Sequence, residues 1–127
     1  NSHQDIFEAK QLRLAICKNQ RFDALGLIDL FEYDPKNNRA GVGILIAKSN
    51  NRNLGIGTEV LELLIQYAFK QLNIHQLYAN IDVENSKSIA LFTKFGFHNV
   101  GVKKEWNLVN GKYQDEALYQ LINQKTI

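Results

Sequence analysis

The feature that most constrains this chain is a junction where an apolar segment meets a glycine-containing turn and then an amphipathic helix. Residues 40–47 are almost wholly apolar, which is typical of a strand in the middle of a sheet. Residues 57–72 carry apolar side chains at helical spacing. Gly55 and Gly57 lie in the turn between them. A strand that leads into a long helix in this way predicts a layered structure of sheet and helices.

The rest of the chain adds strands on both sides of this junction. Alternating apolar residues predict strands at 11–18, 25–33 and 77–83. Leu25, Leu27, Asp29, Phe31 and Tyr33 would share one face of the second of these strands. Gly41 and Gly43 fit a strand that must bulge or admit a ligand closely.

The C-terminal third predicts a short helix and a hairpin. Ser86 is a suitable N-cap for a helix over 87–95, and Gly96 suits the position after its end. Asn110-Gly111 is the preferred pair for a two-residue type I′ turn and predicts a hairpin of 100–109 and 112–121. The expected class is α/β (α+β), with a mixed, mostly antiparallel central sheet and flanking helices.

Size and composition indicate one globular domain, residues 1–127. The net charge of +2 predicts no nucleic-acid partner, and no apolar run reaches the roughly 20 residues of a membrane span. The single Cys excludes an internal disulfide framework, and the three His lack the spacing of metal ligands, so no metal is expected. No signal peptide opens the sequence, which favours the cytoplasm.

The turn at 52–58 has the composition of a phosphate-binding loop, because glycine amides and the helix N-terminus behind them favour an anion. A dinucleotide-binding loop would need a third glycine where Val60 stands. A Walker A loop would need Lys and then Ser or Thr after its last glycine, where Thr58 and Glu59 follow instead. A third pattern, Arg/Gln-x-x-Gly-x-Gly/Ala, is matched by Arg52, Gly55 and Gly57.

A second motif lies about 30 residues further on, since residues 85–97 match Asn-x-x-(Ala/Ser)-x-x-(Leu/Tyr)-Tyr-x-x-x-Gly-Phe except at Phe92. Together the two motifs resemble the GNAT superfamily of N-acetyltransferases, and the resemblance extends from the first alternating strand to residue 122. It is strongest to bacterial spermidine/spermine (diamine) N-acetyltransferases and to ribosomal-protein N-terminal acetyltransferases. It implies the GNAT fold without the family's N-terminal strand and helices, roughly 40 to 50 residues by the length of such elements.

The resemblance implies acetyl-CoA as cosubstrate. The 40–47 strand would diverge from the 77–83 strand and leave backbone groups free for pantetheine, while the amides of the loop would bind the pyrophosphate. Lys87 and Lys94 could approach the adenosine phosphate or simply be solvated. The implied cofactor-binding residues are Ile44, Leu45, Ile46, Arg52, Asn53, Leu54, Gly55, Ile56, Gly57, Thr58, Asn85, Lys87 and Lys94.

The implied reaction is direct attack of a primary amine on the thioester, which needs a base for the amine and an acid for the thiolate. Many family members have a tyrosine as that acid where this chain has Phe92. Three alternatives follow: the thiolate leaves unassisted or through water, Tyr113 or Tyr119 replaces the acid, or the protein binds acyl-CoA with weak turnover.

Asp29 is the first candidate for the base, because an acid on an otherwise apolar strand face is costly unless it has a role; the alternative is that the strand's other face is buried and Asp29 is solvated. A second tier of carboxylates, which would attract a cationic amine, comprises Glu32, Glu84, Glu105 and Asp115.

The expected function is therefore acetyl transfer from acetyl-CoA to a small amine such as a polyamine. The alternatives are acetylation of protein N-termini and a catalytically weak acyl-CoA-binding module. The expected partners are the small-molecule amine and, from the family's habit, further copies of the chain in a homodimer or larger homo-oligomer.

Overall fold

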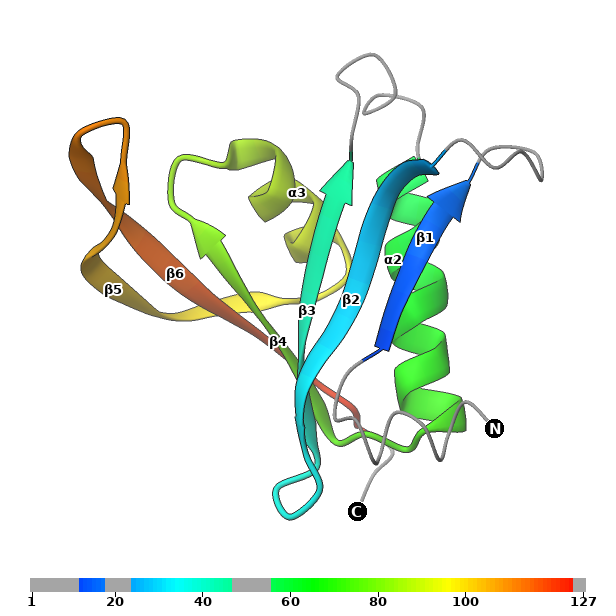
Figure 1. The fold of residues 1–127 in the computed structure, drawn as a ribbon. Helices are drawn as coiled ribbons and strands as arrows, with labels where there is room; N and C mark the ends of the chain where they lie inside the picture. Colours follow the sequence, from blue (N-terminus) through cyan, green and yellow to red (C-terminus); the bar gives the residue numbers. More distant parts are fainter. Residues whose placement is uncertain (1–11, 18–23, 47–55, 125–127) are drawn as a thin grey trace.

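The computed structural model describes residues 12–17, 24–46 and 56–124. Figure 1 shows the order of elements that the sequence predicts, with three strands followed by helix, strand, helix and two strands. The strands are β1 Leu12–Cys17, β2 Ala24–Asp34, β3 Arg39–Ile46, β4 Gln76–Asp82, β5 His98–Val109 and β6 Lys112–Ile122. The helices are α2 Ile56–Gln66, its π-helical continuation η2 Tyr67–Gln71, and α3 Ser86–Lys94.

The strands form one mixed sheet in the order β1-β2-β3-β4-β6-β5. Neighbours are antiparallel except β3 and β4, which are parallel. The predicted mixed, mostly antiparallel sheet is thus confirmed. The parallel pair follows from the connection through α2, because a helical crossover returns the chain to the sheet in the same direction.

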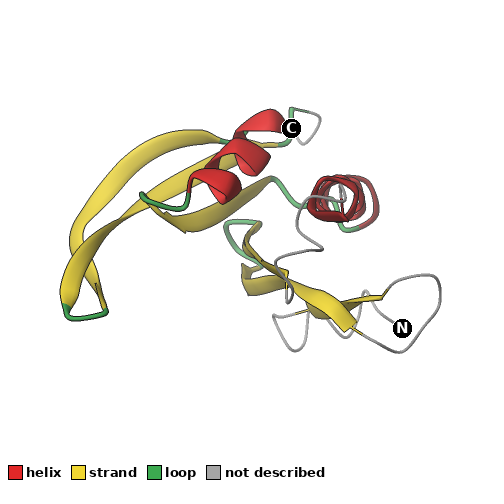
Figure 2. Cartoon of the chain, turned by 90° about the horizontal axis from the view of Figure 1, so that it is seen from above, coloured by secondary structure: helices red, strands yellow, loops and turns green. Residues whose placement is uncertain are grey.

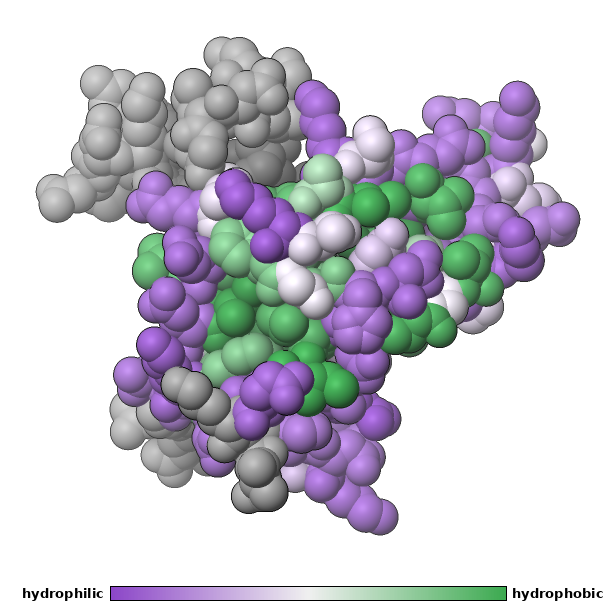
Figure 3. Space-filling model, turned by 180° about the vertical axis from the view of Figure 1, so that it is seen from behind, coloured by the Kyte–Doolittle hydropathy of each residue, from purple (hydrophilic) through white to green (hydrophobic). Residues whose placement is uncertain are grey.

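A single apolar core lies between the sheet and both helices, which cover the same side of the sheet (Figure 2). Figure 3 looks at this helix side and shows apolar side chains at its centre between hydrophilic margins. The largest fully buried side chains are Ile28, Leu30, Leu61, Ile74, Leu77 and Phe97.

The sequence leaves two alternatives open for the buried face of β2, and the structure supports the second, in which the face opposite Asp29 is buried. Ile28 and Leu30 are the buried residues, at 2% and 0% exposure, so Asp29 and Phe31 lie on the face away from the helices. Glu32 has a φ of 51° in an irregular stretch of the β2–β3 pairing, and the extra residue brings Tyr33 back into the core. A bulge of this kind shifts the alternation by one residue, which a strict period of two does not reveal.

The turn and helix signals are confirmed with one correction. Asn110 and Gly111 have φ of 50° and 79°, as a type I′ turn requires. Gly96, with φ of 95°, follows α3 in the left-handed conformation that ends many helices. The N-cap of α3 is Asn85 rather than Ser86, because the Asn85 Oδ1 accepts a hydrogen bond from the Ser88 N–H at 3.2 Å.

The predicted helix over 57–72 changes character near its end. It is α-helical to Gln66 and π-helical over Tyr67–Gln71. Asn123, which is 7% exposed, follows β6 and donates its side-chain amide to the Ile74 carbonyl at 3.1 Å and to the Phe69 carbonyl at 3.5 Å. One buried amide thereby joins the end of the sheet to the end of this helix.

Replacing Asn123 with Ala should lower the free energy of unfolding by about 1–3 kcal/mol, because the buried bond to the Ile74 carbonyl and the partly buried bond to the Phe69 carbonyl are both lost. Urea denaturation followed by circular dichroism measures this loss. The neighbouring exposed Gln124 provides a matched control, since Gln124→Ala removes an amide that the core does not contain. Equal unfolding midpoints for the two variants would contradict the role given to Asn123.

Candidate functional site

The parallel strands β3 and β4 are paired only at their beginnings. The register joins Arg39, Ala40 and Gly41 to Gln76, Leu77 and Tyr78 and then stops. Beyond these pairs each strand remains paired on its outer side, β3 with β2 and β4 with β6. Figure 1 shows the two strands diverging as the arms of a V. We call the region between Val42–Ile46 and Ala79–Asp82 the split.

The split exposes backbone groups in the middle of a sheet. No strand of the described residues pairs with the inner edges of β3 and β4 beyond Gly41 and Tyr78. Backbone N–H and C=O groups need hydrogen-bond partners, so an inner edge of this kind favours an extended ligand with amide groups. The divergence expected from the resemblance is confirmed.

The beginning of α2 meets α3 and β3 beside the split. A Cβ at Gly57 would lie 3.3 Å from Leu91 Cδ2 of α3 and 3.9 Å from Ile44 Cδ1 of β3. Glycine is therefore suited to this position by close packing. The two motifs, which are about 30 residues apart in sequence, are brought into contact here.

The described cofactor-binding candidates lie on the three elements that meet here or directly beside them. Ile44, Leu45 and Ile46 form the end of β3, and Ile56 to Thr58 form the first turn of α2, whose N–H groups are suited to an anion. Asn85, Lys87 and Lys94 are exposed on and beside α3. The other predicted loop residues, Arg52, Asn53, Leu54 and Gly55, lie outside the described residues.

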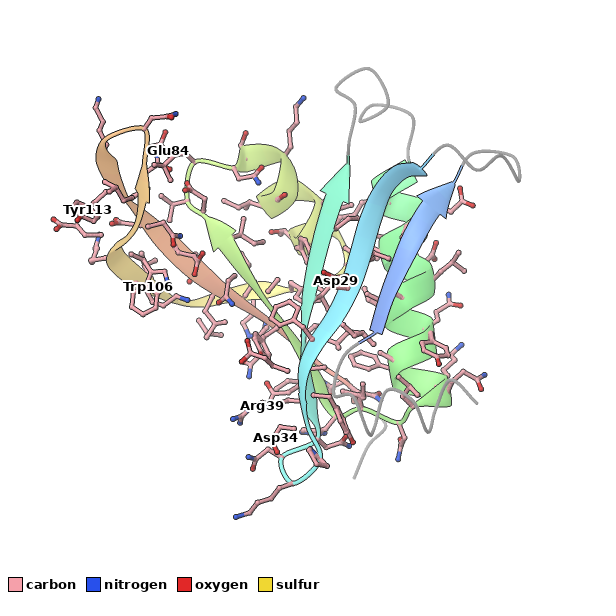
Figure 4. All side chains as sticks on the ribbon, viewed as in Figure 1. Asp29, Asp34, Arg39, Glu84, Trp106 and Tyr113 are labelled. Atoms are coloured by element: carbon pink, nitrogen blue, oxygen red, sulfur yellow. The ribbon has the colours of Figure 1, made fainter. Side chains whose placement is uncertain are left out.

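The face away from the helices carries Asp29, which is partly buried on β2. Its paired residue on β3 is Gly43, so only β3 separates Asp29 from the lower part of the split (Figure 4). The corresponding residue on β1 is Arg13. Of the two alternatives, the one in which Asp29 shares the buried apolar face is wrong, whereas its position near the split suits the role of base that the sequence suggested.

An aromatic pair that the sequence patterns did not indicate lies just below Asp29. The Phe31 ring covers Gly41, where an added Cβ would overlap it, and it meets the Tyr78 ring edge-to-face with centroids 6.1 Å apart. The space above Gly41 is thus filled by the Phe31 ring of the same chain. The positions of Gly41 and Gly43 in the sequence could not show which side chain would lie there. Burial raises the pKa of the Tyr78 hydroxyl, and the charge of Glu32 raises that pKa further.

The predicted second-tier acids are not all gathered with Asp29. Glu32 is exposed on β2, whereas Glu84 follows β4 on the side of the β5–β6 hairpin (Figure 4). Asp115 on β6 accepts the Glu105 N–H at 2.8 Å and the Lys104 ammonium at 3.2 Å. These hydrogen bonds lower the pKa of Asp115 and give it a partner within the hairpin.

A polar network extends the same face across β4, β6 and β5. The Lys103 ammonium donates to Glu116 at 2.7 Å and to Asn80 at 3.1 Å, and it lies 4.8 Å from the centre of the Trp106 ring. Burial opposes ionisation of Glu116, but the hydrogen bonds from Lys103 and Asn107 prevail and lower its pKa.

The tyrosine position of the second motif is buried. Phe92 is 2% exposed and packs edge-to-face on Phe97, with ring centroids 5.0 Å apart. Of the suggested substitutes for the missing acid, Tyr119 is 7% exposed within the core, and Tyr113 is 64% exposed on the hairpin (Figure 4).

The described residues contain no group of three or more His, Cys, Asp and Glu side chains that could hold a metal ion. None of their helices is long and apolar enough to cross a membrane.

Known proteins are similar to this chain in sequence and in fold. A spermidine N(1)-acetyltransferase from Vibrio cholerae is 27% identical over 113 residues, which is 89% of this chain and 65% of that protein. The Escherichia coli K12 protein of the same name is 32% identical over 90 residues, 71% of this chain and 48% of that protein. The chain thus spans between about half and two thirds of these relatives' length.

A solved structure of a related protein has a similar fold. The dodecameric structure of spermidine N-acetyltransferase from Vibrio cholerae has a TM-score of 0.86 and 27% identity, over 96% of this chain and 70% of that one. The family model described as an acetyltransferase (GNAT) domain matches residues 2–98, which contain both motifs and both arms of the split. The chain therefore belongs to the GNAT family.

Proposed function

We propose that this protein is an N-acetyltransferase that transfers an acetyl group from acetyl-CoA to a small primary amine such as a polyamine. The observation that carries the proposal is the split between β3 and β4, which begins after three residue pairs and lies beside the first turn of α2. The similarity to spermidine N-acetyltransferases supports the acceptor class.

The residues present suit acetyl-CoA as the cosubstrate. The pantetheine arm has amide groups that can pair with the inner edge of β3 at Ile44–Ile46, as an added strand would. The first turn of α2, preceded by the glycine loop, supplies N–H donors and a positive dipole end for the pyrophosphate. The side-chain oxygen of Asn85 already accepts a hydrogen bond as the N-cap of α3. The side-chain nitrogen of Asn85 is therefore the atom proposed to bind pantetheine.

The proposed reaction is direct acyl transfer. The amine nitrogen attacks the thioester carbonyl carbon, the new C–N bond forms, and the C–S bond breaks. Asp29 takes the proton that the amine loses, directly or through water. A thiolate is a good leaving group (pKa about 8.5 for a Cys-like thiol), so it takes its proton from water without the tyrosine that Phe92 replaces.

The acceptor enters on the face away from the helices, where Asp29 lies. Asp29 and Glu32 on β2 are the anionic groups proposed to attract a cationic amine there, with Glu84, Glu105 and Asp115 at a second position on the hairpin side. Asp115 pairs with Lys104 at 3.2 Å, so part of its charge is already balanced within the hairpin.

The protein is further proposed to act as a homo-oligomer. The Vibrio cholerae relative is dodecameric by its title. The β5–β6 hairpin of this chain projects from the rest of the sheet (Figure 1). It exposes several large apolar side chains. These include Val100, Val102, Trp106, Leu108 and Tyr113.

Gly57→Val should weaken CoA binding by about tenfold or more. The larger side chain would press on Leu91 and move the helix N-terminus, and overpacking of this kind costs about 1–3 kcal/mol. Isothermal titration with CoA measures the affinity. Gly101→Val is the matched control, because nothing lies within 4 Å of a Cβ at Gly101. Equal affinity in both variants would exclude the first turn of α2 from the site.

Asp29→Asn should lower kcat by about 10²- to 10⁴-fold, since the amide cannot accept the amine's proton, and should leave CoA binding unchanged. A thiol-release assay with acetyl-CoA and spermidine, run across pH, measures this loss. Glu62→Gln makes the same change at an exposed position on α2 and should keep the wild-type rate. Wild-type kinetics in Asp29→Asn would remove Asp29 from the site.

Phe92→Tyr should retain or raise the rate of acetyl transfer, because it restores the acid that the family pattern places there. The same assay with a panel of amines and N-terminal peptides measures the rate. Activity on peptides alone would favour protein N-terminal acetylation, and CoA binding without turnover would favour a weak acyl-CoA-binding module. A large loss of kcat with CoA still bound would argue against this position for Phe92.

A further inference from the structure

We propose that Glu116, Asn80 and Trp106 form a binding site for a primary alkylammonium group, and that the Lys103 ammonium occupies this site in the free chain. Lys103 then competes with amine ligands for the same contacts. The site goes beyond the proposed function, since it lies on β4, β6 and β5, away from Asp29, and binds a cation without any acetyl transfer.

The Lys103 ammonium is held by groups of three different kinds. Its Nζ donates to Glu116 Oε1 at 2.7 Å and to Asn80 Oδ1 at 3.1 Å, and it lies 4.8 Å from the centre of the Trp106 ring. Oxygen acceptors satisfy the N–H donors of an ammonium group, and an aromatic face attracts its charge. These contacts do not involve the lysine backbone, so the ammonium of a free amine can make them as well.

A bulge in β5 brings Trp106 to this position. The register with β6 shifts just after Lys103, where residues 104–106 lie opposite the single residue Asp115. Glu105 in this bulge has a φ of 49°, and Asp115 accepts its N–H at 2.8 Å. Bulges redirect side chains, and this one places the indole ring over the lysine three residues earlier. The aromatic wall of the site is thus fixed by the backbone of the hairpin.

Glu116 is also positioned independently of Lys103. Its second oxygen, Oε2, accepts the Asn107 side-chain amide at 3.0 Å, which leaves Oε1 for the ammonium. The Glu116 side chain is only 17% exposed, and a carboxylate removed from water to this extent is costly without a partner. Loss of the Lys103 ammonium therefore leaves an anionic oxygen that a free ammonium can satisfy.

The site can be reached from solvent. Asn80 is exposed, Trp106 is 58% exposed, and the Lys103 side chain is 31% exposed. Lysine carries its charge on a flexible stem, and ion pairs near the surface contribute little to stability. The ammonium can therefore leave while the hairpin stays folded. A ligand ammonium then takes the place that the lysine has vacated and needs no further cavity.

Competition with a tethered group lowers the affinity for a free amine. The apparent dissociation constant is the intrinsic one divided by the fraction of chains in which the site is open. From the strength of exposed ion pairs and cation–π contacts, removal of Lys103 should tighten amine binding about three- to tenfold. For an acceptor of the proposed polyamine class, Lys103 thereby limits how strongly this face holds the ligand.

The test is a fluorescence titration, because Trp106 is the only tryptophan in the chain and its emission reports this site. Spermidine and n-propylammonium, the part of a lysine side chain beyond Cβ, are added without CoA at constant ionic strength. Lys103→Ala should bind both about three- to tenfold more tightly than the wild type. The uncharged analogue n-propanol should cause no saturable change.

Lys112→Ala is the matched control, since it removes the same charge from an exposed position on the same hairpin, and it should keep the wild-type affinity. Glu116→Gln, added to Lys103→Ala, should abolish the gain, because the amide has no charge to attract an ammonium. Lys103→Met keeps an unbranched side chain beside the ring. It serves, with Lys112→Met as its control, where circular dichroism shows that Lys103→Ala is not folded.

The outcomes separate this site from the proposed function. An affinity gain at position 103 no greater than the gain at position 112 overturns the proposal, as does a gain that persists with Glu116→Gln. A gain confined to position 103 and dependent on Glu116 supports it, whether or not the chain releases thiol from acetyl-CoA. Absence of thiol release contradicts the proposed catalysis alone.

Discussion

The early end of the pairing between β3 and β4 is the constraint on which the rest of the structure depends. A parallel pair inside a sheet normally continues for the length of its strands, because every unpaired N–H and C=O group costs free energy. Here the pairing stops at Gly41 and Tyr78 while both strands continue. The outer partners β2 and β6 keep each arm extended, so the unpaired edges face each other across the split.

The helices and the end of the chain hold this arrangement from two sides. Beside the split, α2 and α3 approach closely at Gly57 and Leu91. At the foot, the Asn38 carbonyl accepts the His75 N–H at 2.9 Å, and the His75 carbonyl accepts the Asn123 N–H at 2.7 Å. The arms thus diverge from a base in which the β2–β3 turn, the start of β4 and the end of β6 are hydrogen-bonded together.

Much of the fold could be predicted from the sequence, because the signals were local. The period of α2, the Asn110-Gly111 turn and Gly96 each determine their own conformation. The two motifs also indicated the family, and with it the divergence of β3 from β4. The buried face of β2 could not be predicted in the same way, since the bulge at Glu32 depends on the pairing with β3.

The site shows the same division between local and long-range signals. The loop and the second motif could be found because each is a continuous stretch of the sequence. The contact of Tyr78 with Phe31 could not be found in this way, because Phe31 lies 47 positions earlier in the sequence. Likewise, the hairpin partners of Asp115 are visible only in the folded chain. The acids that the sequence suggested as one group are therefore divided in the structure, where Asp29 lies apart from those on the hairpin side.

The contact between Phe31 and Gly41 also has an evolutionary consequence. Because the ring occupies the space of a Cβ at position 41, the two positions cannot vary independently. A lineage that enlarges residue 41 must first shrink or redirect residue 31, and the intermediate with both side chains large is disfavoured by overlap. Substitutions at positions 31 and 41 are thereby restricted to paired replacements, one on each of two neighbouring strands.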